Sequence, residues 1–227
     1  MEKIEIDFSE SDFRLLDASI ELDALEEHLQ LIKRQMEHIE RTVRRKTETY
    51  ICKEGLCPDD PEWHIAWQNC NYRIDSLPRF FRGPFLVALY AAYESIVTEI
   101  ARLIQAKQSQ NIKINDLKGD FLERAKKYYK HILKFDLYSE EKVWQQIHML
   151  STLRNAFAHA NGRLDMLNEK SKKKIRKWEK EKRGISTYYG YIICESNIVT
   201  DLFDVARGSL ENLIERYKHW DDQNGHT

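Results

Sequence analysis

Apolar residues recur at three- and four-residue steps along the first part of the chain. Between about residues 12 and 48 they are Leu15, Leu22, Leu25, Leu29, Ile32, Met36, Ile39 and Val43. Such a stripe follows one side of an α-helix and leaves the charged residues on the other side. The segment therefore predicts one long amphipathic helix. Its heptad-like spacing is also compatible with coiled-coil pairing to another chain, so a solvated polar face and a paired helix both stay open.

A second, strongly apolar segment predicts a central helix from Pro84 to about Lys107. No charged residue occurs between Arg82 and Glu94. Because an isolated carboxylate is costly to bury, Glu94 is either held in the interior by a partner or faces an opening.

The rest of the chain predicts further helices and one short pair of strands. The periodicity favours a polar loop over residues 108–115, a helix over residues 117–135, and a last helix from Ser196 or Asn197 to about Trp220. Tyrosines and isoleucines around Gly190 favour a small β-hairpin or an extended flap over residues 185–194. We therefore predict an all-α bundle of about five to seven helices with a small hairpin.

Residues 50–83 have the least regular pattern. Three cysteines and a histidine lie here among prolines and tryptophans: Cys52, Cys57, His64 and Cys70. Thiolates and imidazole are zinc ligands, but the spacing differs from the tight pairs of structural zinc sites. A zinc site and small buried thiols both remain compatible with the pattern. We interpret residues 1–83 as an N-terminal helix followed by this irregular segment, within one domain over residues 1–227 whose core is residues 84–220.

An apolar helix with polar residues on one flank is predicted from Ser139, a suitable N-cap, to the helix-ending pair Asn161-Gly162. Val143, Ile147 and Leu150 mark its core-facing stripe, and Arg154 falls there too. His148, Asn155 and His159 fall together on the neighbouring stripe. On a straight helix Arg154 and His159 diverge by about 140°. Either the helix unwinds near His159, or a second copy of the chain completes a site.

The string Arg154-Asn155-x-x-x-His159 resembles the signature of the HEPN superfamily, helical domains that include many metal-independent RNA-cleaving toxins of prokaryotic defence and toxin–antitoxin systems. The resemblance covers roughly residues 84–220, and only the motif itself is specific. It implies a HEPN-type helical bundle with an acid near the motif, here Glu94, and we expect His148 to support the site. The other interpretation is structural: basic residues often lie at a helix end to cap and solvate it.

The three motif residues suit RNA cleavage by the 2′-hydroxyl. An imidazole such as His159 transfers protons near neutral pH, and the forked donors of Arg154 suit a phosphate. Asn155 can orient the imidazole ring or donate to the phosphate. One histidine per chain fills one of two proton-transfer roles, so we expect a homodimer. The predicted function is a metal-independent endoribonuclease without cofactor. The alternative is a non-catalytic HEPN-like module that binds RNA, a nucleotide or a partner protein.

A toxin interpretation also implies a cognate antitoxin or defence partner. The HEPN toxins paired with a minimal nucleotidyltransferase antitoxin carry a tyrosine two residues after the motif histidine, and this chain has Asn161 there. Neutralisation by modification of that tyrosine is therefore in doubt.

A lysine-rich stretch is the predicted RNA-binding segment. Between Glu169 and Arg183 basic residues outnumber acidic ones three to one. The candidate contacts are Lys172, Lys173, Lys174, Arg176, Lys177 and, for stacking on a base, Trp178. A solvated surface helix explains the same composition.

Composition sets the outer limits. Charged residues make up 32% of the 227-residue chain but sum to −1, so any polyanion site must be local. We expect no membrane span, no signal peptide and a cytoplasmic protein with reduced cysteines. Glycine-rich phosphate loops and the motifs of serine hydrolases and zinc proteases do not occur in the sequence.

Overall fold

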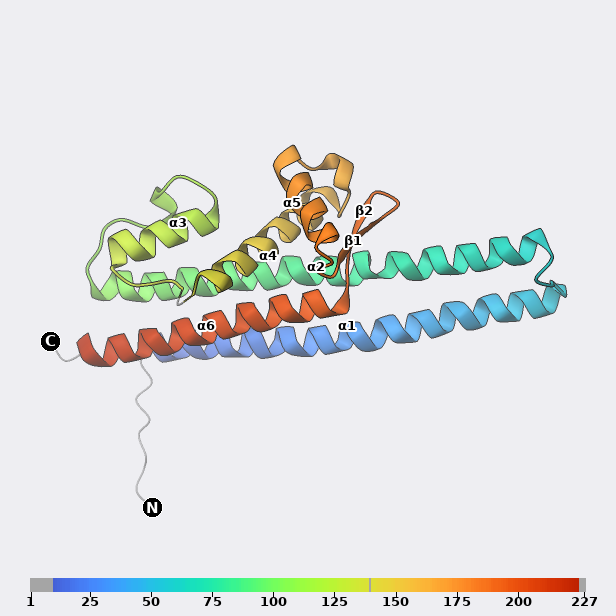
Figure 1. Ribbon diagram of the computed structural model, residues 1–227. Helices are drawn as coiled ribbons and strands as arrows, with labels where there is room; N and C mark the ends of the chain where they lie inside the picture. Colours follow the sequence, from blue (N-terminus) through green and yellow to red (C-terminus); the bar gives the residue numbers. More distant parts are fainter. Residues whose placement is uncertain (1–9, 139, 225–227) are drawn as a thin grey trace, which may run out of the picture. The chain divides into compact units, whose positions relative to one another are not determined.

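The computed structural model describes residues 10–138 and 140–224 and confirms the all-α class. The helices are α1 (Glu10–Glu54), α2 (Pro61–Lys107), α3 (Phe121–Lys127), α4 (Glu141–Ala160), α5 (Glu169–Lys180) and α6 (Ser196–Asn224), and the strands are β1 (Ile185–Tyr188) and β2 (Tyr191–Cys194) (Figure 1). Short 3₁₀ turns cover Ile114–Asp116 and Leu164–Met166, and a π-helical turn covers Tyr128–Leu133. The predicted long first helix, hairpin and last helix are all present.

The prediction of an irregular segment over residues 50–83 is wrong. Helix α1 continues to Glu54 and α2 already begins at Pro61, so only a short turn separates them. Proline suits the first position of a helix because its missing N–H has no partner there in any case. The Asp60 carboxylate accepts the Cys57 N–H at 2.6 Å and closes the turn.

Helix α2 passes through Pro78 and Pro84 without ending. Each interior proline removes one backbone hydrogen bond, at a cost of about 3 kcal/mol. Buried apolar side chains on the same helix, among them Cys70, Phe85 and Leu86, offset this cost. The predicted boundary at residues 83 and 84 therefore falls inside a continuous helix.

The chain divides into two compact units that share four helices. The first consists of the described residues of Met1–Glu26, Ala88–Ser151 and Leu202–Thr227, and the second of Glu27–Val87 and Thr152–Asp201. Helices α1, α2, α4 and α6 each contribute to both units.

Buried tyrosines form much of the core of the first unit. The Tyr93 hydroxyl donates to the Tyr138 hydroxyl at 2.9 Å, and the Tyr129 hydroxyl donates to the Val97 carbonyl at 2.6 Å. Burial raises the pKa of Tyr93, Tyr129 and Tyr138 above the ordinary phenol value, so all three stay neutral. These paired hydroxyls let large rings fill the core without leaving polar atoms unsatisfied.

The second unit is built around Phe157 of α4. Its ring lies against Gly83 of α2, where an added Cβ would be 2.5 Å from Cδ1, and against Gly162, where an added Cβ would be 2.9 Å from Cε1. The two glycines therefore form the seat of the ring. In the same unit β1 pairs antiparallel with β2, from Ile185 opposite Cys194 to Tyr188 opposite Tyr191.

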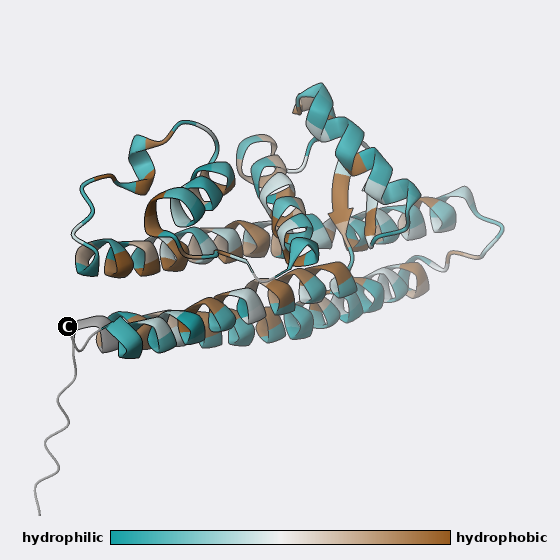
Figure 2. Ribbon diagram, turned by 60° about the vertical axis from the view of Figure 1, so that its left-hand side comes forward, coloured by the Kyte–Doolittle hydropathy of each residue, from teal (hydrophilic) through white to brown (hydrophobic). Residues whose placement is uncertain are grey.

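Helix α5 is more hydrophilic than the hairpin beside it. Figure 2 shows α5 as a largely hydrophilic helix beside a hairpin with hydrophobic stretches. Ile175 is the fully buried residue of α5, and the strand residues Ile185 and Ile192 are also buried. Within residues 10–138 and 140–224, one helix, α2, is long and apolar enough to cross a membrane by length and composition, and 56% of its most apolar window is buried.

We predict opposite effects for alanine at two helical glycines. Gly83→Ala places a methyl group against the Phe157 ring, so it should lower the free energy of unfolding by about 1–3 kcal/mol. Gly208→Ala, on α6, meets nothing within 4 Å and should raise it by about 0.5–1 kcal/mol. Urea unfolding followed by circular dichroism measures both. Equal stability of the two variants would contradict the close contact at Gly83.

Candidate functional site

The motif residues occupy the last two turns of α4. Leu153, Ala156 and Ala160 face the interior and are at most 6% exposed. Arg154 is half-buried, while Asn155 and His159 are exposed. The apolar positions thus fix the helix to its unit and leave the polar flank accessible.

Helix α4 remains α-helical through Ala160 and then stops at the predicted pair. Asn161 and Gly162 adopt the left-handed conformation, with φ of 47° and 74°. Their N–H groups donate to the carbonyls of Phe157 and Ala156 at 3.1 and 3.0 Å. The helix does not unwind at His159, so that alternative is wrong. The predicted N-cap Ser139 lies outside the described residues.

The Arg154 side chain reaches across the helix surface to Asn155. Its Nη1 donates to Asn155 Oδ1 at 2.8 Å. Asn155 and His159 are one turn apart, which places their Cβ atoms about 5–6 Å from each other. The guanidinium group of Arg154 therefore lies on the same side of the helix as the Asn155 amide, although the Cα–Cβ bonds of Arg154 and His159 point in very different directions. The long, flexible Arg154 side chain thus brings its guanidinium group closer to the flank of His159 than the backbone geometry alone predicts.

The end of α4 is joined to the hairpin. The Gly162 carbonyl accepts the Ile192 N–H at 2.8 Å, and Arg163 forms an antiparallel bridge with Tyr191. Together with the seat of Phe157, these bonds fix the last turn and hence the backbone of His159.

Glu94 and His148 belong to the first unit, whereas the motif belongs to the second. Glu94 is half-buried on α2. The His148 ring lies edge-on to Trp144, with centroids 4.4 Å apart, and its Nε2 is 4.0 Å from Glu123 Oε1. Support of the motif by these two residues stays a prediction.

The basic helix α5 presents only some of its predicted contacts outward. Lys172 lies against the protein, 19% exposed, and bonds to Glu169 at 2.9 Å. Trp178 is half-buried, so it is not a freely exposed stacking residue. The residues opposite buried Ile175 are the exposed Lys173, Lys177 and Lys180. Lys174 is half-buried, and Arg176 is exposed to one side.

The cysteine-containing segment does not assemble a metal site in the described part of the chain. Cys52, Cys57 and His64 are exposed, and Cys70 is buried. Among residues 10–138 and 140–224, no three histidine, cysteine or acidic side chains are grouped so as to hold a metal ion.

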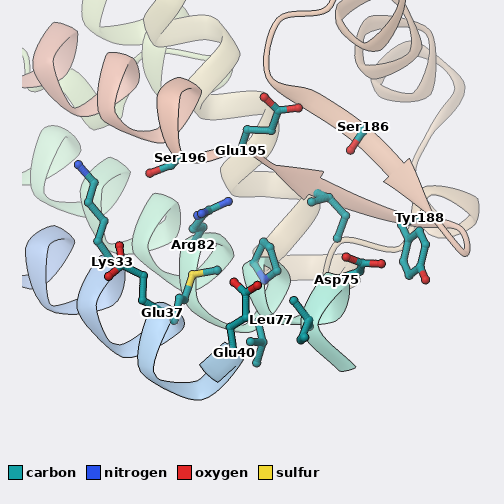
Figure 3. A pocket seen from close by; sticks show the side chains of 14 residues that line it. Lys33, Glu37, Glu40, Asp75, Leu77, Arg82, Ser186, Tyr188, Glu195 and Ser196 are labelled. Atoms are coloured by element: carbon teal, nitrogen blue, oxygen red, sulfur yellow. The ribbon is translucent and has the colours of Figure 1, made fainter. Parts of the chain in front are cut away.

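A cavity of about 570 Å³ lies in the second unit between α1, α2 and the hairpin (Figure 3). Four carboxylates line it: Glu37, Glu40, Asp75 and Glu195. The lining cations are Lys33 and Arg82. Sequence analysis missed this cavity because its residues come from separate segments. Its lining includes none of the motif residues, and its excess of carboxylates disfavours a phosphate backbone.

Arg82 ties the cavity to the hairpin. Its Nη1 donates to the Cys194 carbonyl at 2.8 Å. Burial lowers the pKa of the Arg82 guanidinium, and burial raises the pKa of the Cys194 thiol to about 12. The one signal in the sequence was Arg82 itself, the last charge before a long uncharged stretch.

Comparisons with known proteins add no family assignment. No protein-family model, curated protein or solved structure matches this chain. Inference about function therefore rests on the residues and their geometry.

We predict that the thiols divide into two classes toward iodoacetamide at pH 8. The thiolate is the reactive form, and a pKa of about 12 leaves only about one Cys194 in 10⁴ ionised at that pH. Exposed Cys52 and Cys57 should therefore react, while buried Cys194 and Cys70 should be protected until the protein is unfolded. Peptide mass mapping identifies the modified residues. Modification of native Cys194 as fast as Cys57 would contradict the burial.

Proposed function

We propose that this protein is a metal-independent endoribonuclease whose catalytic residues are Arg154, Asn155 and His159. The observation that carries the proposal is the Arg154 guanidinium bonded to Asn155 on the flank of exposed His159. The resemblance of this string to the HEPN signature supports the same function. A cation, an amide and an imidazole on one accessible surface suit a phosphodiester.

In the proposed reaction the ribose 2′-oxygen forms a bond to the adjacent phosphorus, and the bond from phosphorus to the 5′-oxygen breaks. A neutral imidazole takes the 2′-hydroxyl proton, and an imidazolium gives a proton to the leaving 5′-oxygen. The Arg154 guanidinium stabilises the negative charge on the phosphorane oxygens. The products are a 2′,3′-cyclic phosphate and a free 5′-hydroxyl.

A homodimer would supply both proton-transfer groups. One chain contributes one His159, so a second copy provides the other histidine around a two-fold axis. Two facing arginines repel each other, and apolar surface elsewhere must hold the dimer. Exposed Phe13, Leu16 and Ile20 follow one another at helical spacing on α1 and offer such a surface.

The second candidate is a non-catalytic HEPN-like module that binds RNA, a nucleotide or a partner protein. It is supported by the cavity near Arg82, whose lining includes no motif residue and therefore gives His159 no cleft. A scaffold role predicts that Arg154 and His159 are buried in separate hydrogen bonds. The exposure of Asn155 and His159 favours the enzyme instead.

We predict RNA cleavage that persists in EDTA and depends on the motif. His159→Ala should lower the cleavage rate about 10²-fold or more, because it removes general acid–base catalysis. Arg154→Ala should also inactivate, and Asn155→Ala should have a smaller effect. Denaturing electrophoresis of total RNA measures cleavage, with end analysis for cyclic phosphate. His38→Ala, a change at an exposed histidine of α1, is the matched control and should cleave like the wild type. Full activity of His159→Ala would rule out the proposed site.

We also predict that inactive variants complement each other. If the site is shared, mixing Arg154→Ala with His159→Ala protein under conditions of chain exchange should restore part of the activity. Each mixed dimer then keeps one arginine and one histidine. Sedimentation measures the dimer, and Leu16→Glu on the exposed α1 stripe should weaken it. A wild-type monomer that is fully active at nanomolar concentration would contradict the shared site.

A further inference from the structure

The tip of the hairpin carries a tyrosine in an unusual conformation. Tyr189 and Gly190 form the two-residue turn, with φ of 48° and 79°. This geometry is that of a type I′ turn, whose first position favours asparagine, aspartate or glycine. A bulky residue at positive φ is disfavoured, yet the Tyr189 side chain is 74% exposed and gains little burial in return. Such strain at an exposed position indicates a function for the ring.

Three tyrosines gather at this tip, and we call them the tyrosine platform: Tyr72, Tyr188 and Tyr189. The Tyr189 ring lies edge-on to Tyr188 and Tyr72, with centroids 4.6 and 5.5 Å away. Tyr188 lies beside Asp75 (Figure 3). Burial and the Asp75 charge raise the pKa of the Tyr188 phenol, so it stays a donor. Tyr72 and Tyr189 are 49% and 74% exposed, so both rings are accessible to a ligand.

The platform is connected to the motif through backbone contacts within the second unit. The Gly190 carbonyl accepts the Leu164 N–H at 2.9 Å, next to the bridge between Arg163 and Tyr191. The path from His159 through this bridge to Tyr189 is at most about 28 Å between Cα atoms. This is the length of about eight nucleotides even at the short rise of a duplex strand. A short RNA bound at the motif can thus reach the platform.

Positive charge lies on the elements around the platform. The Arg79 guanidinium lies over the Tyr191 ring, 3.8 Å from its centroid. Helix α5 is bound to the hairpin, since Glu179 accepts both the N–H and the hydroxyl of Thr187 at 2.8 and 2.7 Å. Its outward lysines, Lys173, Lys177 and Lys180, offer contacts for phosphates. Aromatic faces beside a basic helix are the combination that binds single-stranded nucleic acid.

We infer that the tyrosine platform stacks a base of single-stranded RNA that lies within about eight nucleotides of the scissile phosphate. This inference rests on the proposed function and adds its substrate class. Single strands are required because the faces of bases in a duplex are covered by their neighbours. Stacking on tyrosine tolerates any base, so the platform does not select a sequence. It instead selects single-stranded over double-stranded RNA and fixes which nucleotide lies at the motif.

Fluorescence anisotropy with a labelled ten-nucleotide RNA tests the inference in the His159→Ala background, where cleavage is prevented. Tyr189→Asn removes the ring and places a favoured residue in the turn, so misfolding does not explain a loss. It should weaken binding about 5- to 100-fold. Tyr189→Phe should bind within about twofold of the parent. Tyr50→Leu, at a half-exposed tyrosine of α1 in the same unit, is the matched control and should bind like the parent.

Two further arms separate stacking from charge. An RNA with abasic positions should bind the parent and Tyr189→Asn alike, because no base remains to stack. Replacing Lys173, Lys177 and Lys180 with Gln should reduce the salt dependence by about one unit of slope per phosphate contact, whereas Tyr189→Asn should leave the slope unchanged.

Equal RNA affinity of Tyr189→Asn and the parent overturns the inference and points to a protein-docking role for the tip, as does absence of RNA binding by the parent. Cleavage by the wild type together with unchanged affinity of Tyr189→Asn would refute the platform and leave the ribonuclease standing. Loss of affinity in Tyr189→Asn without any cleavage by the wild type would refute the ribonuclease and leave the platform.

Discussion

The contact of Phe157 with Gly83 and Gly162 is the constraint on which the second unit depends. The ring lies where any other residue at either position would place a Cβ within 3 Å. Because Phe157 lies between Arg154 and His159 in the sequence, the same contact sets the rotation of α4. Leu153 and Ala156 then face inward, and Asn155 and His159 face outward. The surface chemistry of the motif is thus a consequence of packing on the opposite side of its helix.

Periodicity predicted most of the fold because the relevant signal is local. The long first helix, the hairpin around Gly190 and the end of α4 at Asn161 each follow from a few neighbouring residues. The prediction of an irregular segment over residues 50–83 was wrong because the signal that decides it is not local. Prolines at 78 and 84 normally end helices, and only the burial of residues such as Cys70 and Phe85, contributed by tertiary packing, keeps α2 continuous.

The site could be predicted in part. Residue spacing placed Asn155 and His159 on one flank of α4, and both are exposed. Spacing could not predict that Arg154 would reach Asn155, because a flexible side chain does not follow the direction of its Cα–Cβ bond. It also could not reveal the cavity near Arg82, whose lining residues are brought together only by folding. Composition gave Trp178 as a stacking residue, but that side chain is half-buried, whereas Tyr189 at the hairpin tip is 74% exposed.

The near-zero net charge conceals a separation of charge within the second unit. Carboxylates outnumber cations around the cavity between α1, α2 and the hairpin, whereas α5 directs lysines outward. Interactions between exposed charges are screened beyond about 8–10 Å at physiological salt, so each surface acts on a ligand mainly by its own composition. By composition alone, α5 favours a polyanion and the lining of the cavity disfavours one. The hairpin contributes to both surfaces, with Tyr188 lining the cavity and Tyr189 exposed at the turn. Tyr189 is not among the residues that line the cavity, so its exposed ring is available to a polyanion outside the acidic lining.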